Sequence, residues 1–118
     1  MELWKELITI ERQLNDALAT LRTNGIDYCE AERLYQMEKS KQTMRLKSEG
    51  YPITLIPQVV KGLENVAELD YIRNKAEVVY KANLEAINIK KLELRVLEAQ
   101  IEREWGNAKN DWWRSCYV

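Results

Sequence analysis

The beginning of the chain carries an apolar side chain every three or four residues. The spacings are 4, 3, 4, 3 and 4, so these side chains return to one face of a helix, and they are Leu3, Leu7, Ile10, Leu14, Ala17 and Leu21. Charged residues such as Glu6, Glu11 and Arg12 fall off this line. The pattern predicts a helix with one apolar packing face.

The triplet Thr23-Asn24-Gly25 allows two interpretations. Asn and Gly often end a helix because they tolerate the left-handed conformation. Yet apolar residues recur between 28 and 46 among good helix formers, and a glycine inside a helix costs only about 1 kcal/mol relative to alanine. One helix over residues 2–48 with a weak point at Gly25 is favoured, and two helices broken there are the alternative.

A turn and a short helix are expected next. Gly50 and Pro52 stop the first helix. A connecting helix is predicted over residues 54–61, with Thr54 as its N-cap and Pro57 in its first turn. Its apolar side chains are expected to plug the closed end of a hairpin, and they are Leu55, Ile56, Val59 and Val60.

The stretch 63–105 contains no proline and no glycine, which predicts one helix about 65 Å long at 1.5 Å per residue. Together with 2–48 it forms a long antiparallel helical hairpin. The chain as a whole has 46% hydrophobic and 31% charged residues but only four glycines and two prolines, which indicates an all-α fold. A hairpin domain over residues 1–106 and a tryptophan-rich tail over 107–118 are expected.

The second helix has more apolar surface than one partner helix covers. Two lines of apolar residues run along it, the first comprising Leu69, Ile72, Ala76, Val79, Ala86 and Val96, and the second Tyr80, Leu84, Ile87, Leu94, Leu97 and Ile101. Large apolar patches on proteins in water usually mean association. We expect a homodimer that closes a four-helix bundle. A three-helix monomer buries the same surface if the first helix breaks at Gly25.

Basic residues gather near the end of the first helix, namely Lys39, Lys41, Arg45 and Lys47. In the antiparallel hairpin they face acidic residues of the second helix, namely Glu64, Glu68, Asp70 and Glu77, and such rim pairs set the register. The same four basic residues are the candidate contacts for phosphate or nucleic acid, and Lys90, Lys91 and Arg95 are additional candidates. A solvated helix face is the other interpretation.

All four tryptophans fall at the open end of the predicted hairpin, with Trp4 beside Trp105. Gly106-Asn107 is expected to end the long helix. The tail that follows supplies the candidate partner-binding residues Trp112, Trp113, Arg114 and Tyr117, because aromatic and arginine side chains dominate binding hot spots. The tail could instead cap the bundle end, or stack a nucleobase.

The residue inventory argues against catalysis. The chain has no histidine, which removes the commonest general base and metal ligand, and its glycines form no phosphate-binding loop. Its two cysteines, Cys29 and Cys116, have no zinc spacing and are expected to be reduced thiols. No metal and no cofactor is expected. A net charge of −1 disfavours a general nucleic-acid coat, and no signal peptide or membrane span is visible, so a cytoplasmic location is expected.

Three stretches of the chain carry a resemblance. They are Glu49-Gly50-Tyr51-Pro52-Ile53-Thr54-Leu55-Ile56, the run from Ala76 to Asn88, and Leu97-Glu98-Ala99-Gln100-Ile101-Glu102-Arg103-Glu104-Trp105. Together with the Lys61-Gly62 stop, they resemble a group of short all-helical proteins encoded by phages and prophages of Gram-positive bacteria. The resemblance covers roughly residues 10–106 and leaves out the tail.

The resemblance implies a protein that acts by binding. A non-enzymatic phage accessory protein that inhibits a bacterial host or defence protein is the first expectation. A nucleic-acid or nucleotide binder in phage replication, recombination or signal sequestration is the alternative. A structural coiled-coil component of a virion is a third, less favoured interpretation.

Overall fold

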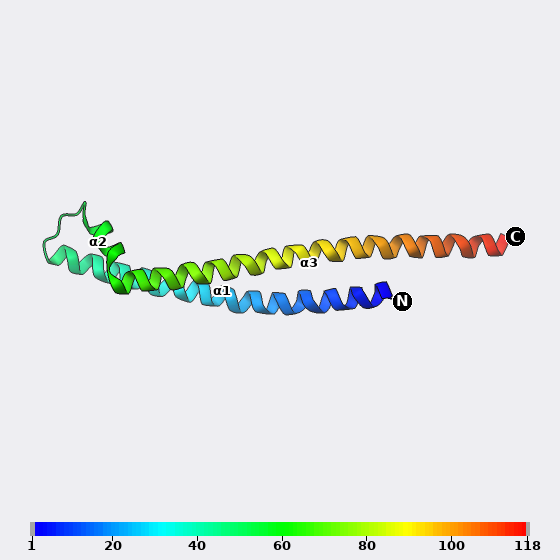
Figure 1. Ribbon diagram of the computed structural model, residues 1–118, viewed down its shortest axis with the longest axis horizontal. Helices are drawn as coiled ribbons and strands as arrows, with labels where there is room; N and C mark the ends of the chain where they lie inside the picture. The colour runs from blue at the N-terminus through cyan, green and yellow to red at the C-terminus, as the bar shows by residue number, and fades with distance from the viewer. Residues whose placement is uncertain (1, 118) are drawn as a thin grey trace. The chain divides into compact units, whose positions relative to one another are not determined.

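The computed structural model describes the backbone of residues 2–117 and the side chains of residues 2–107. It contains helices α1 (Glu2–Ser48), α2 (Ile56–Gly62) and α3 (Glu64–Tyr117), and no strand occurs within the described residues (Figure 1). α1 and α3 form an antiparallel pair with the short α2 at the turn between them. The predicted all-α class and helix pair are confirmed.

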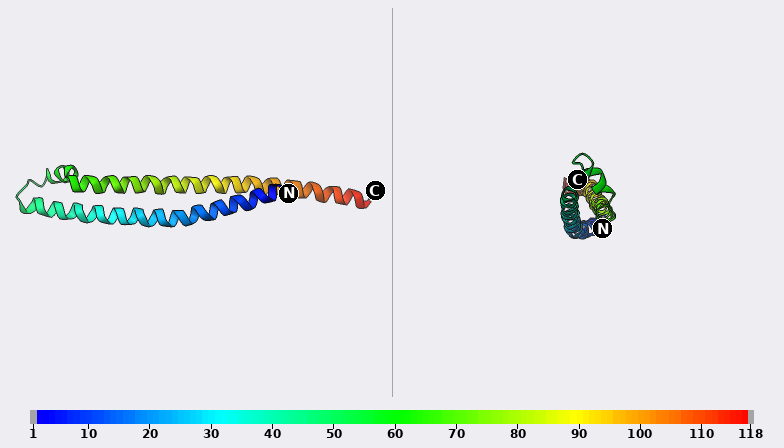
Figure 2. Two further views of the ribbon diagram at one scale, coloured as in Figure 1. Left: turned by 60° about the horizontal axis from the view of Figure 1, so that its bottom comes forward. Right: turned by 90° about the vertical axis from the view of Figure 1, so that its left-hand side faces the viewer.

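The chain divides into two compact units. The closed unit is Leu21–Asn83, and it contains the second half of α1, α2 and the beginning of α3. The open unit joins Met1–Thr20 to Leu84–Val118. In each unit a segment of α1 lies alongside a segment of α3 (Figure 2).

Gly25 does not interrupt α1, which runs unbroken from Glu2 to Ser48. A Cβ atom added to Gly25 would lie 3.4 Å from Cε2 of Tyr80, so the glycine sits directly against that ring. Tyr80 also packs on Tyr28, with 5.9 Å between the ring centroids. The alternative of a helix broken at Gly25, and with it the three-helix monomer, is therefore wrong.

The end of α1 is a Schellman motif built on Gly50, whose φ of 86° lies in the left-handed region. The Gly50 N–H donates to the carbonyl oxygen of Lys47 over 3.2 Å, and the Tyr51 N–H donates to that of Leu46 over 3.2 Å. The predicted stop at residue 48 is confirmed. These bonds satisfy carbonyl groups that the helix end would otherwise leave open.

The connecting helix α2 begins at Ile56, two residues later than predicted. Its N-cap is Leu55, which makes no side-chain hydrogen bond, and Thr54 lies in the preceding turn. The expectation of a Thr54 cap is therefore wrong. Pro57 does occupy the first turn of α2, where its missing N–H costs nothing.

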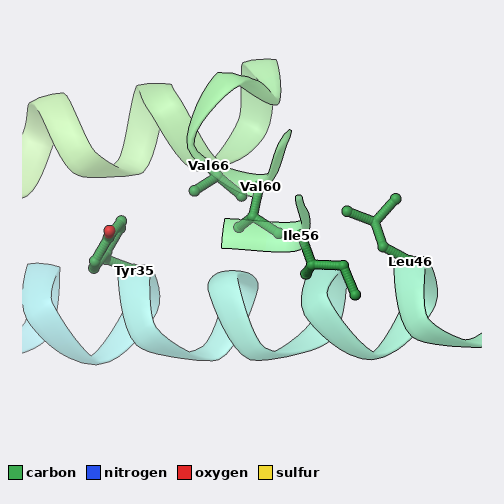
Figure 3. Packing of buried hydrophobic residues seen from close by; sticks show 5 residues of the cluster. All are labelled: Tyr35, Leu46, Ile56, Val60 and Val66. Carbon is green, nitrogen blue, oxygen red and sulfur yellow. The ribbon is translucent and has the colours of Figure 1, made fainter. Parts of the chain in front are cut away.

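The closed unit has a hydrophobic core where α2 packs between α1 and α3 (Figure 3). The buried cluster consists of Tyr35, Leu46, Ile56, Val60 and Val66. The plug expected from the sequence is thus formed by Ile56 and Val60, with Val59 at its edge. Leu55 is half exposed and belongs to the surface.

The packing seam of α3 combines parts of both predicted apolar lines. Its buried residues and most of its half-buried ones follow a heptad and are Val66, Leu69, Arg73, Ala76, Tyr80, Asn83, Ile87, Lys90, Leu94, Leu97 and Ile101. Three other residues, Asp70, Glu77 and Gly106, are half-buried without belonging to this heptad. Ile72, Val79 and Val96 were expected on one packing line but are exposed. Three positions of this heptad are polar, namely Arg73, Asn83 and Lys90, so the apolar pattern alone did not reveal it.

α3 does not end at Trp105 as predicted, because its backbone continues through Gly106-Asn107 to Tyr117. Gly106 is not in the left-handed conformation that ends a helix. A helical glycine costs about 1 kcal/mol, which a long helix tolerates. The segment 107–118, expected as a separate tail, is thus helical in its backbone up to residue 117.

Candidate protein-binding surfaces

The open unit contains an aromatic groove between the beginning of α1 and the last part of α3. Its volume is about 960 Å³. Leu3 and Ile101 contribute seam positions to it, and the exposed indoles of Trp4 and Trp105 add large apolar surface. The predicted neighbourhood of these two tryptophans is confirmed. Both tryptophans are at least half exposed, and tryptophan is among the residues most enriched at the hot spots of protein interfaces.

Three carboxylates complete the lining of the aromatic groove, from Glu2, Glu102 and Glu104. None of them forms an ion pair with another described side chain. Glu2 lies in the first turn of α1, where the helix dipole favours a negative charge. The groove therefore combines an apolar surface with a negative rim.

A second apolar surface lies on α3 in the same unit. Ile89, Leu92 and Val96 are 49%, 58% and 65% exposed, and their spacings of three and four residues align them along one face. A shallow hollow of about 500 Å³ adjoins this face at Val96, Ala99, Glu102 and Arg103.

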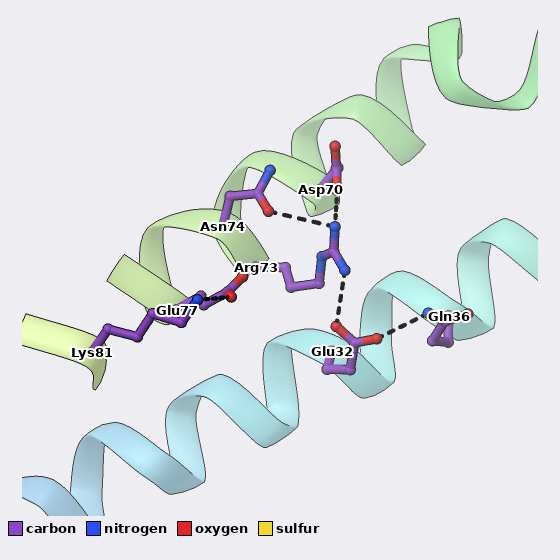
Figure 4. A network of polar contacts seen from close by, with 7 residues as sticks. All are labelled: Glu32, Gln36, Asp70, Arg73, Asn74, Glu77 and Lys81. Atoms are coloured by element: carbon purple, nitrogen blue, oxygen red, sulfur yellow. Dashed lines mark hydrogen bonds and ion pairs between the residues drawn. The ribbon is translucent and has the colours of Figure 1, made fainter. Parts of the chain in front are cut away.

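The closed unit is held in register by a polar cluster around Arg73 (Figure 4). The Arg73 guanidinium donates to Glu32 across the helix pair over 3.2 Å and to Asp70 over 2.7 Å. It also stacks on the buried ring of Tyr35, 4.4 Å from the centroid. Of the buried side-chain polar atoms in the described residues, only the Nε of Arg73 lacks a hydrogen-bond partner.

The carboxyl group of Glu32 is the acidic centre of this cluster. The pKa of Glu32 lies below its usual value, and the hydrogen bond from Gln36 is the largest cause. Desolvation opposes this shift, and the hydrogen bond and charge of Arg73 add to the lowering. Arg73 and Glu32 make the ion pair that joins the two long helices. The pairs expected between the basic end of α1 and the acidic start of α3 are not formed: Asp70 pairs with Arg73, and Glu77 pairs with Lys81.

A second polar contact crosses the closed unit at seam positions. The amide of Asn24 donates to that of Asn83 over 2.9 Å. A single asparagine pair in an apolar seam fixes which residues lie opposite one another. Sequence reasoning missed this contact and treated Asn24 as part of a helix stop. The heptad that continues from Leu21 through Asn24 to Tyr28 was the signal that could have revealed it.

The four candidate phosphate contacts on α1 do not share one face. At about 100° per residue, Lys41 and Arg45 lie on one side of the helix, and Lys39 and Lys47 on another. Arg45 pairs with Glu49, and the ammonium group of Lys39 lies 5.8 Å from the centre of the Tyr35 ring. These positions do not bring the basic residues together.

The candidate partner-binding residues of the tail are Trp112, Trp113, Arg114 and Tyr117. Their backbone belongs to α3, and their side chains lie outside the described part of the structure. α3 extends beyond the start of α1 in the open unit (Figure 2), so these positions follow the aromatic groove along the same helix.

The described residues hold no group of three or more Cys, Asp or Glu side chains placed to bind a metal ion, and Cys29 is an exposed free thiol. Among them, no helix has the length and apolar character that a bilayer crossing requires.

Comparison with known proteins gives no family for this chain: no family model, no curated protein and no solved structure matches it.

Proposed function

We propose that this protein acts by binding another protein and that the aromatic groove is its main contact. The observation that carries the proposal is the pair of exposed indoles of Trp4 and Trp105 beside a hollow of about 960 Å³. Tryptophan is among the residues most enriched in binding hot spots, since its ring brings a large area with few rotatable bonds. The tail residues Trp112 and Trp113 extend the same aromatic surface in this proposal.

The exposed surface of the chain supports a role in association. Among the described side chains, nineteen large hydrophobic ones are exposed and eight hydrophobic ones are buried, so the helices leave much apolar side-chain surface uncovered.

The proposal includes two associations, which use different parts of the exposed apolar surface. One is a homodimer, formed through the exposed face of α3. The other is the capture of a bacterial host or defence protein, which the resemblance to small phage proteins suggests and which places the protein in the bacterial cytoplasm. Binding, and not catalysis, would then produce inhibition.

The test is affinity capture from bacterial lysate, with captured proteins quantified by mass spectrometry. The double variant Trp4→Ala/Trp105→Ala removes both walls of the groove, and Met44→Ala removes an equally exposed side chain of the closed unit as a control. We expect one host protein to be captured in fixed ratio by the wild type and the control and to be lost with the double variant. A second double variant, Trp112→Ala/Trp113→Ala, tests the tail.

Circular dichroism must show equal helicity for all variants, because only then does lost capture report on contact. Equal capture by wild type and the Trp4/Trp105 variant would refute the groove as the binding site.

A further inference from the structure

The outer face of α3 in the open unit carries a second heptad line. It lies opposite the packing seam of the helix, with spacings of 4, 3, 4, 3 and 4, and consists of Glu85, Ile89, Leu92, Val96, Ala99 and Arg103. The four inner positions are apolar and exposed, and the two ends carry opposite charges. A helix with apolar lines on two opposite faces has room for two partner helices.

The residues of this line are complementary to those of a second copy that lies antiparallel to the first. A two-fold axis at the level of Leu94 places Leu92 opposite Val96 of a second copy, and Ile89 opposite its Ala99. The same axis places Glu85 opposite Arg103 of the second copy, at both ends. Neither Glu85 nor Arg103 forms an ion pair with another described side chain. A parallel pairing would instead set like charges against each other at each end.

We propose that two copies pair back to back through residues 85–103 of α3, antiparallel, with the symmetry axis at the level of Leu94. The inference rests on the proposed self-association and specifies its surface and register. Such an isologous contact is self-complementary in shape and charge. Since the line points away from α1, the four helices in this proposal form a layer with both α3 helices in the middle, which differs from the closed four-helix bundle expected from the sequence.

Charge reversal tests the register by sedimentation equilibrium at low salt. Glu85→Arg and Arg103→Glu should each weaken the dimer about tenfold, because each replaces two attractive contacts by two repulsive ones. The double variant Glu85→Arg/Arg103→Glu should restore the dissociation constant to within about threefold of the wild type. Lys75→Glu, a reversal on the same helix outside the interface, is the control and should change it less than twofold.

Cysteine cross-linking tests the direction of pairing in a Cys29→Ser/Cys116→Ser background. A mixture of Leu92→Cys and Val96→Cys chains should form a disulfide-linked heterodimer under mild oxidation, because opposed positions bring Cα atoms within about 7 Å. Dominant linkage of Leu92→Cys chains to each other would indicate parallel pairing and overturn the proposal.

The outcomes distinguish an error in the proposed dimer surface from an error in the proposed self-association. A dimer that is indifferent to charge reversal and gives no heterodimer leaves self-association standing but overturns this surface. A monomer at all concentrations overturns both, while leaving capture of a host protein at the aromatic groove to its own test.

Discussion

Replacing Gly25 by alanine should stabilise the protein, although this glycine has the sequence context of a helix stop. Gly25 is inside α1 and has no positive φ, so alanine fits its backbone conformation. The change gains up to about 1 kcal/mol of helix propensity. The added Cβ would meet Cε2 of Tyr80 at 3.4 Å and Cδ2 at 3.8 Å, which are ordinary van der Waals contacts at the close end of their range. We expect a net gain of about 0.5–1 kcal/mol.

The measurement is urea unfolding followed by circular dichroism at 222 nm, at one protein concentration because association shifts apparent stability. Gly50→Ala is the matched control. Its φ of 86° lies in the left-handed region, so the same substitution should cost about 1 kcal/mol there. A decrease of more than about 1 kcal/mol in the free energy of unfolding of Gly25→Ala would refute this prediction. It would mean that the Tyr80 ring cannot move aside or that α1 is not continuous.

Two further predictions concern the polar contacts of the closed unit. Asn83→Leu alone should cost about 1 kcal/mol because it leaves the Asn24 amide without its hydrogen bond, whereas Asn24→Leu/Asn83→Leu should regain that stability and give mixed oligomers in light scattering. Glu32→Gln should be less stable than the wild type near pH 6. Since Gln36 and then Arg73 hold the pKa of Glu32 below its unfolded value, that difference should shrink as the pH falls below about 4.3. A difference that does not shrink between pH 6 and pH 3, or no recovery in the double asparagine variant, would contradict these assignments.

The helix pair could be predicted because its signals are local. Leu3 to Leu21 keep a strict heptad of apolar residues, and Gly50 with Pro52 marks a stop whose left-handed conformation favours glycine. Such signals depend on one residue and its near neighbours, so no knowledge of the partner helix is needed.

The seam of α3 and the end of that helix could not be predicted in the same way. Arg73 occupies a packing position because Tyr35 and Glu32 of the other helix supply a ring and a carboxylate for its guanidinium. Asn83 occupies another because Asn24 lies opposite. A polar residue at a seam position is identified only by its cross-helix partner, and apolar periodicity alone therefore shifted the assignment to exposed residues such as Val79.

One feature of the aromatic groove, the proximity of Trp4 and Trp105, could be predicted from the sequence. The open end of an antiparallel hairpin necessarily brings the first residues of one helix near the last residues of the other, which placed Trp4 beside Trp105. The acidic rim was not foreseen, because Glu2, Glu102 and Glu104 look like ordinary surface residues until the groove between the helices is known.

The position of α2 has a consequence for the order of folding. The core around it joins residues from Tyr35 to Val66, whereas the walls of the groove, Trp4 and Trp105, are about three times further apart in sequence. Closing the longer loop directly costs about 1 kcal/mol more in chain entropy. We expect refolding to begin at the turn and the pairing of α1 with α3 to extend from there toward the termini. The two tryptophans are then the last to meet and the first to separate, and a partner bound to both would slow the earliest step of unfolding.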